Sequence, residues 1–142
     1  MRSPSELRLA KLHIMATKTL FSIIESATHP NFTELYLSLG IRETRINSMR
    51  KAIATLKQQQ PDFLVAEFFY GYGNNYAGVN ISNLDVLLYS LQKYSPTTKV
   101  IVLVDKSEYI HVDKLNKIIK LHDILKSPVS IKQMQEPLTR KS

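Results

Sequence analysis

Residues 61–67 read Pro-Asp-Phe-Leu-Val-Ala-Glu, and residues 99–104 read Lys-Val-Ile-Val-Leu-Val. Each run is short and apolar, and each is bounded by polar or turn-forming sequence. Runs of this kind are typical of strands that are buried on both faces of a parallel sheet, where alternation with polar residues is lost. The two runs therefore predict the central strands of such a sheet.

Three further segments carry weaker strand signals. Residues 35–39, Leu-Tyr-Leu-Ser-Leu, alternate in polarity before Gly40 and predict a half-buried edge strand. Residues 12–15 and 124–125 are shorter candidates. Because Ser3-Pro4-Ser5-Glu6 also has the form of a helical capping box, residues 3–15 stay open between strand and helix.

Apolar residues recur at helical spacing in four other segments. The four sets are Ile46, Met49, Ile53 and Leu56; Ile81, Leu84, Leu87, Leu88 and Leu91; Val112, Leu115, Ile118 and Ile119; and Ile131, Met134 and Leu138. Strands that alternate with single helices indicate βαβ crossovers, with helices on both faces of a parallel sheet. The sequence thus predicts a three-layer α/β/α domain with a five-stranded, doubly wound, flavodoxin-like sheet.

The length of 142 residues predicts one domain over residues 1–142, with flexible ends at 1–8 and 139–142. No apolar run approaches the roughly 18 residues of a membrane span, and no secretory signal is visible, so we expect a cytoplasmic protein without membrane contact. The absence of cysteine excludes disulfides and thiolate zinc sites. The four histidines show no metal-ligand spacing, so neither a metal nor a cofactor is expected.

The net charge of +7 is unevenly distributed along the chain. Clustered basic residues attract polyanions, although solvated helix faces are the alternative explanation. The residues concerned are Arg42, Arg45, Arg50, Lys51 and Lys57, with Lys114, Lys117 and Lys120 further on. They make nucleic-acid binding an alternative function.

Residues 67–78 concentrate glycines and aromatic residues. Their spacing forms neither a dinucleotide-binding fingerprint nor a P-loop, because no Lys-Ser or Lys-Thr pair follows the glycines. No basic residue interleaves with the aromatics, as single-strand binders would require. We therefore expect a partner-contact or lid-like loop after the strand at 61–67.

Residues 61–67 resemble the third strand of the receiver domain of response regulators, in which this strand ends at the phosphoacceptor aspartate. Residues 99–104 resemble the fourth strand, and residues 125–130 resemble the lysine-containing end of the fifth. The interval of 22 positions between Val104 and Lys126 also suits the family. The resemblance implies a module of two-component signalling and transcription regulation, to which a DNA-binding domain is often attached.

Phosphorylation of a receiver needs an aspartate nucleophile, acidic residues for a divalent cation, a hydroxyl and a lysine. By this alignment only Lys126 matches in kind. The departures are Glu67 at the acceptor, Ala16 and Thr17 at the acidic pair, Val104 at the hydroxyl and Asp123 at the switch aromatic. The resemblance therefore implies a degenerate phosphoacceptor pocket formed by Glu67, Lys126, Val104 and Thr17.

The alignment predicts that Glu67 and Lys126 lie together at the carboxyl ends of adjacent strands. Such a pair would mimic a phosphorylated state by giving Lys126 a fixed negative charge. The alternative is a structural ion pair whose net contribution to stability is near zero.

The leading hypothesis is a non-enzymatic, phosphorylation-independent regulatory module that binds a protein partner or a second copy of itself. The predicted interaction face comprises Asp113, Lys114, Lys117 and Asp123, around the helices on either side of the fifth strand. Two alternatives are a basic nucleic-acid-associated domain, and a small flavodoxin-like enzyme that uses residues 68–78. Nucleic-acid contact through an attached domain would also be compatible with the leading hypothesis.

Overall fold

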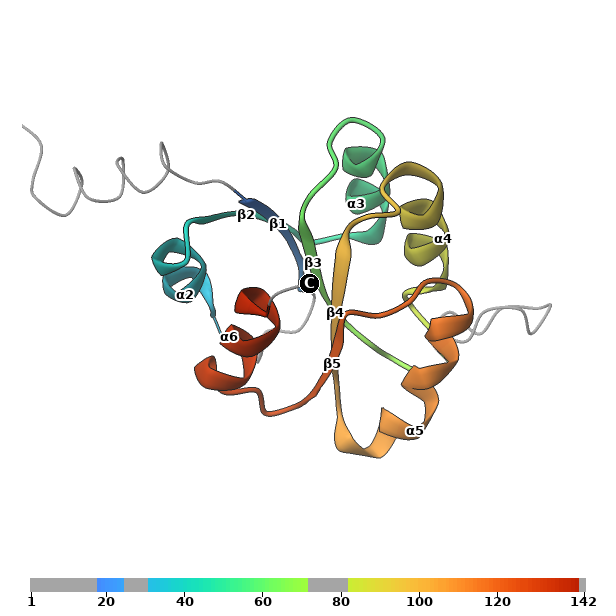
Figure 1. Ribbon diagram of the computed structural model, residues 1–142. Coiled ribbons are helices and arrows are strands. Elements are labelled where there is room, and N and C mark those ends of the chain that lie inside the picture. The colour runs from blue at the N-terminus through green and yellow to red at the C-terminus, as the bar shows by residue number, and fades with distance from the viewer. Residues whose placement is uncertain (1–17, 25–30, 72–81, 141–142) are drawn as a thin grey trace, which may run out of the picture.

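The computed structural model describes residues 18–24, 31–71 and 82–140. Within them, five strands form one sheet in the order β2-β1-β3-β4-β5, and every neighbouring pair is parallel (Figure 1). The strands are β1 (Lys18–Ile23), β2 (Ile41–Ile46), β3 (Phe63–Glu67), β4 (Lys99–Val104) and β5 (Asp123–Lys126). This is the doubly wound, flavodoxin-like order, so the predicted fold class is confirmed.

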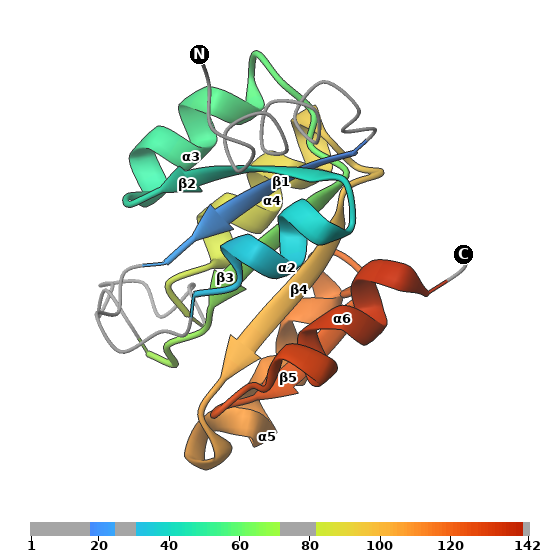
Figure 2. The same cartoon turned by 90° about the vertical axis from the view of Figure 1, so that its left-hand side faces the viewer.

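Helices cover both faces of the sheet and produce three layers (Figures 1 and 2). One face carries α3 (Met49–Leu56), α4 (Asp85–Tyr94) and α5 (Tyr109–Val112), and the other carries α2 (Thr33–Ser38) and α6 (Ile131–Thr139). Successive residues of a strand point to opposite faces, so each strand contributes side chains to two separate apolar cores.

The sequence of β1 shows this division of the core. Phe21 and Ile23 pack on the side of α3 and α4, whereas Leu20 packs on the side of α2 and α6. In β3, Leu64 and Phe63 are divided in the same way. The residues of β4 are divided likewise between the two cores, so the apolar runs at 61–67 and 99–104 are buried on two faces, as predicted.

The helix predicted from the apolar spacing around Met49 forms as α3. Its N-cap is Ser48, whose hydroxyl accepts a hydrogen bond from the backbone N–H of Lys51 at 3.2 Å. The last helix, α6, begins with a capping box in which Ser130 and Gln133 exchange hydrogen bonds between side chain and backbone. Local capping chemistry therefore agrees with the apolar pattern at both helices.

The edge strand predicted at residues 35–39 is wrong, because these residues belong to α2 and its C-terminal end. Leu35 and Tyr36 are buried side by side, as a helix face allows and an alternating strand does not. Gly40 has a φ of +72°, which ends the helix, and the edge strand β2 follows directly. The edge strand is one element later than predicted.

The strand candidate at residues 12–15 lies outside the described residues, and the first strand of the sheet is β1. The single helix predicted around residues 112–119 is divided into a 3₁₀ turn η1 (Lys106–Glu108), the short α5, and a second 3₁₀ segment η2 (Asp113–Lys117). Val112 and Leu115 are both buried, and their three-residue spacing suits the tighter 3₁₀ geometry as well as an α-helix.

Of the tail expected to be flexible, residues 139 and 140 are described, and residues 141 and 142 lie outside the described residues. Thr139 is the last residue of α6, and Arg140 forms ion pairs with the body of the domain. The predicted flexible segment at residues 1–8 lies outside the described residues.

Candidate functional site at the carboxyl edge of the sheet

The carboxyl ends of β3, β4 and β5 bring Glu67, Val104 and Lys126 to one edge of the sheet. In register, Glu67 pairs with Leu103, and Val104 pairs with Lys126. The backbone hydrogen bonds between β3 and β4 continue one residue beyond Glu67, because Phe68 N–H donates to Leu103 O at 2.8 Å. Three of the four residues predicted to form the degenerate pocket are thus at the same edge.

The expectation that Glu67 and Lys126 occupy adjacent strands is wrong, because β4 lies between β3 and β5. Two inter-strand spacings separate the two backbones by roughly 10 Å. The Lys126 ammonium lies over the ring of Tyr109, with Nζ 4.1 Å from the ring centroid. A cation over an aromatic face at this distance is stabilised electrostatically. The structure therefore gives Lys126 an aromatic neighbour from α5.

Thr17 lies outside the described residues, and so does Ala16. Because β1 runs from Lys18 to Ile23, Thr17 precedes this strand in the chain, and the residues that follow it are Ile24 and Glu25. The alignment of Thr17 with the acidic pair is therefore wrong. One acidic residue, Glu25, is close behind β1 in sequence; it too lies outside the described residues.

Asn83 fixes the turn that leaves β3, and the sequence did not single it out. Its side-chain oxygen accepts from Phe69 N–H at 2.7 Å, and its amide nitrogen donates to Glu67 O at 2.8 Å. Its backbone N–H also donates to Phe69 O at 3.2 Å. One half-buried amide thus holds the backbone on both sides of Phe68. Asn is a common turn residue, but only the fold shows which loop it spans.

Tyr70 connects the turn after β3 to the helical segment after β4. Its backbone N–H donates to Glu108 Oε2 at 3.2 Å, and its ring stacks on His111 with centroids 3.6 Å apart. The Lys114 ammonium lies 5.2 Å from the centroid of the Tyr70 ring and 3.5 Å from His111 Nδ1. The predicted loop at 68–78 therefore begins in contact with α5; its residues from 72 onward lie outside the described ones.

The four residues of the predicted interaction face are in three different environments. Asp113 accepts from Asn116 Nδ2 at 2.9 Å, Lys114 lies beside Tyr70, and Lys117 is exposed. Asp123 forms an ion pair with Arg140 at 2.8 Å. Although all four are described, no hydrogen bond or ion pair joins any two of them. The four residues therefore do not form a cluster.

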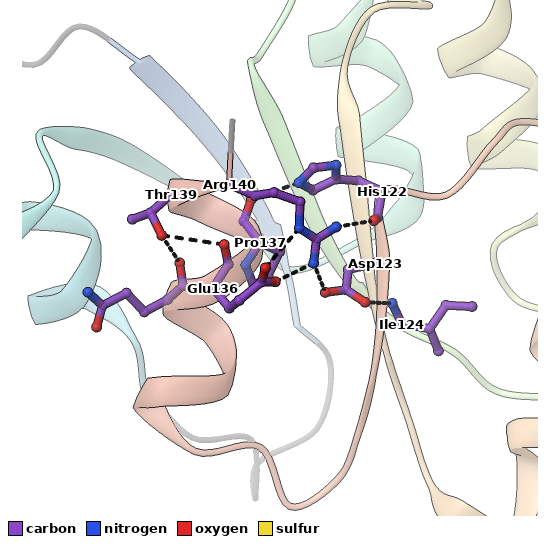
Figure 3. A network of polar contacts seen from close by, with 8 residues as sticks. His122, Asp123, Ile124, Glu136, Pro137, Thr139 and Arg140 are labelled. Atoms are coloured by element: carbon purple, nitrogen blue, oxygen red, sulfur yellow. Dashed lines mark hydrogen bonds and ion pairs between the residues drawn. The ribbon is translucent and has the colours of Figure 1, made fainter. Parts of the chain in front are cut away.

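Arg140 ties the end of α6 to the start of β5 (Figure 3). Its guanidinium donates to Asp123 Oδ2, to both carboxylate oxygens of Glu136 and, at 3.1 Å, to His122 O. His122 Nε2 in turn lies 2.7 Å from Pro137 O. The hydrogen bonds from Arg140 hold the pKa of Glu136 below its usual value, and both carboxylates raise the pKa of Arg140.

We expect Arg140→Gln to lower the melting temperature at neutral pH and to have a smaller effect in acid. The pKa of Glu136 is lower in the folded state than its ordinary value of 4.5. The stability that the Glu136 carboxylate contributes is therefore fully present above pH 4.5 and is lost as the pH falls through the folded pKa. Melting curves of both proteins across this range test the prediction. Lys132→Gln, an exposed cation on α6, is the control. A melting difference that is independent of pH would contradict it.

The described part of the chain shows neither a metal-binding cluster nor a membrane-spanning helix. Residues 18–24, 31–71 and 82–140 contain no group of three or more His, Cys, Asp or Glu side chains that could hold a metal ion. No helix in these ranges is long and apolar enough to cross a bilayer.

No protein-family model matches the chain, and no curated protein matches it in sequence. Solved structures match its fold. A response regulator from Thermotoga maritima is 17% identical with a TM-score of 0.60, over 87% of this chain and 99% of the other. The signal receiver domain of a putative LuxO repressor protein from Vibrio parahaemolyticus is 12% identical with a TM-score of 0.58, over 83% and 84% of the two chains.

The chain has the receiver fold. An adenylate cyclase from Rhodopirellula baltica also matches, at 11% identity and a TM-score of 0.64, over 83% of this chain and 82% of that one. The receiver fold is therefore shared with structures of different descriptions, so function has to be argued from the residues at the site.

Proposed function

We propose that this chain is a receiver-like regulatory module that works through protein–protein contacts and without phosphorylation or enzymatic turnover. The proposal rests on the residue at the end of β4, Val104. Val104 is buried there between the strands that end in Glu67 and Lys126, and it has no hydroxyl to bind a phosphoryl oxygen.

Two neighbours of Val104 support the same conclusion. Glu67 replaces the shorter aspartate that the receiver fold uses as nucleophile, which moves its carboxylate by one methylene. Lys126, which would neutralise a phosphoryl group, lies over the Tyr109 ring instead. The site thus retains the acid and the cation of a receiver in positions that favour a fixed arrangement over a switched one.

The face formed by α5, β5 and α6 is the proposed contact surface. It exposes apolar side chains at the start of both helices: Ile110 is 76% exposed and Ile131 is 60% exposed. Lys114 and Lys117 lie on η2 beside α5. An apolar centre with charged residues at its rim is the usual composition of a protein interface. The proposed partner is a second copy of the chain or another protein, in a cytoplasmic signalling pathway that controls transcription.

We expect no stable acyl phosphate when the protein is incubated with acetyl phosphate and magnesium. The physical reason is that Val104 supplies no hydroxyl and Glu67 does not place its carboxylate where an aspartate would. Intact-mass spectrometry is the measurement. The Glu67→Asp variant is the matched control and should also stay unmodified, since Val104 is unchanged. A stoichiometric adduct on the wild-type chain at Glu67 would overturn the proposed function.

A further inference from the structure

A hollow of about 450 Å³ lies between helix α2 and the edge strand β2, at the opposite edge of the sheet from β5. Its volume is within the range of small-molecule sites, about 300–1,000 Å³. The polar side chains that line it include Tyr36, Glu43 and Arg45. Leu37 and Ile41 add apolar surface. The lining thus combines both signs of charge with a hydroxyl and an apolar wall.

The polar side chains of the hollow come from two elements and face the same side of the sheet. Ile41 packs in the core beneath α2, so Glu43 and Arg45, two and four residues later on β2, face α2 as well. Their Cα atoms are roughly 7 Å apart. Thr33 Oγ1 on α2 donates to Glu43 Oε1 at 2.8 Å, so this carboxylate points toward the helix. Tyr36 is buried in the same core.

Tyr36 is the most informative of these residues. It is only 1% exposed, and its hydroxyl forms no hydrogen bond with any described residue. Every fully enclosed side-chain nitrogen or oxygen in the described part of the chain has a partner, so the Tyr36 hydroxyl opens into the hollow that it lines. Buried polar groups nearly always have partners, so water or a ligand in the hollow satisfies this one.

The charges around Tyr36 keep its hydroxyl a donor. Burial raises the pKa of Tyr36, the Glu43 carboxylate raises it further, and the Arg45 guanidinium opposes them. The phenol is therefore protonated at neutral pH. These electrostatic effects also show that both charged side chains act on the same hydroxyl.

Both charged groups of the hollow keep binding capacity. The Arg45 guanidinium forms no ion pair or hydrogen bond with a described residue. Glu43 uses Oε1 for Thr33, and its Oε2 accepts from no residue in the described ranges. A simple anion in the hollow would be repelled by Glu43, and a simple cation by Arg45. A ligand that carries both charges is therefore favoured.

We propose that this hollow binds a free α-amino acid with an aliphatic side chain. Arg45 and the Tyr36 hydroxyl hold the carboxylate of the ligand, and Glu43 accepts from its ammonium group. Leu37 and Ile41 contact its side chain. The planar guanidinium of arginine is suited to a carboxylate, and hydrogen bonds between charged groups are the stronger kind. Because both charges of an α-amino acid are attached to one carbon, a single molecule can engage two residues on one face of a strand.

The test is a heteronuclear NMR titration of the whole chain with L-leucine. Two truncated probes accompany it: 4-methylpentanoate, which lacks the ammonium group, and 3-methylbutylamine, which lacks the carboxylate. We expect leucine to shift the backbone amides between residues 33 and 45. Each truncated probe should bind at least about tenfold more weakly, because one charged group of the hollow then has no partner. No shift with leucine, or equal binding of either truncated probe, would overturn the proposal.

Three variants separate a formed site from surface charge. Tyr36→Phe removes a hydroxyl without a protein partner, so its melting temperature should be unchanged or slightly raised. It should nonetheless bind leucine several-fold more weakly, because one donor to the carboxylate is lost. Arg45→Gln should weaken binding by at least about tenfold. Arg42→Gln, on the same strand but on the opposite face, is the matched control and should leave the affinity unchanged. Unchanged affinity in Tyr36→Phe, or equal losses in Arg45→Gln and Arg42→Gln, would contradict the proposed site.

Discussion

Leu88→Ala is expected to lower the free energy of unfolding by about 2–5 kcal/mol, the range for large-to-small changes at closed core positions. Leu88 lies on α4 and is 0% exposed, in the core that α4 shares with β3 and β4. The loss has two parts: the transfer free energy of the removed methylenes, and the cavity that rigid strands on one side cannot close. Chemical denaturation of both proteins measures the difference.

The matched control for Leu88 is two residues earlier on the same helix. Val86 is 54% exposed, so Val86→Ala should change the free energy of unfolding by less than about 0.5 kcal/mol. Alanine is a good helix former at both positions, so helix propensity cannot account for a loss of stability in Leu88→Ala alone. Equal destabilisation by the two variants would show that α4 does not pack on the sheet through Leu88.

Charge reversal of Lys114 and Lys117 together is expected to weaken self-association or partner binding by about tenfold, which corresponds to 1.4 kcal/mol. Both residues lie on η2 at the rim of the proposed contact surface. Like charges that face each other across an interface are costly. Charges at the rim of an interface act mainly on the rate at which the two partners associate. Light scattering over a concentration series, repeated at high salt, measures the change. Salt should reduce the difference between variant and wild type.

Arg50→Glu with Lys57→Glu is the control, because it changes the net charge equally, on α3 and at the C-cap that follows it, away from this surface. It should leave association unaffected. A strict monomer at all concentrations, with no response to reversal of Lys114 and Lys117, would exclude self-association through this surface. A different protein would then be the remaining partner.

The buried strands and helices could be predicted from sequence because residues buried in a core are mostly apolar, and the sequence shows that pattern directly. The runs at 61–67 and 99–104 are β3 and β4, and most of the apolar residues predicted for α3, α4 and α6 lie in the cores. Two members of those sets were wrongly assigned: Ile46 ends β2, and Ile131 is 60% exposed. The edge strand could not be predicted in the same way. β2 reads Ile-Arg-Glu-Thr-Arg-Ile, with only its two ends buried, so it carries no apolar pattern. The alternation at residues 35–39 was stronger and belongs to a helix.

The candidate site was also predicted in part. The carboxyl ends of parallel strands must meet at one edge, so Glu67, Val104 and Lys126 could be placed together. The contacts of Lys126 with Tyr109 and of Asp123 with Arg140 depend on how helices pack, which spacing along the chain does not encode. The alignment of Thr17 was wrong because β1 begins after it.

The position of β1 between β2 and β3 has a consequence for synthesis of the chain on the ribosome. β2 follows β1 closely, but β3 begins 40 residues after β1 ends. At about 5–20 residues per second, the interval is roughly 2–8 s. During it, one edge of β1 has no partner strand, and Phe21 and Ile23 lack the side chains of β3 and α4 beside which they are finally buried. The nascent N-terminal half is thus exposed to aggregation for seconds, and a slower passage through residues 24–62 would lengthen that exposure.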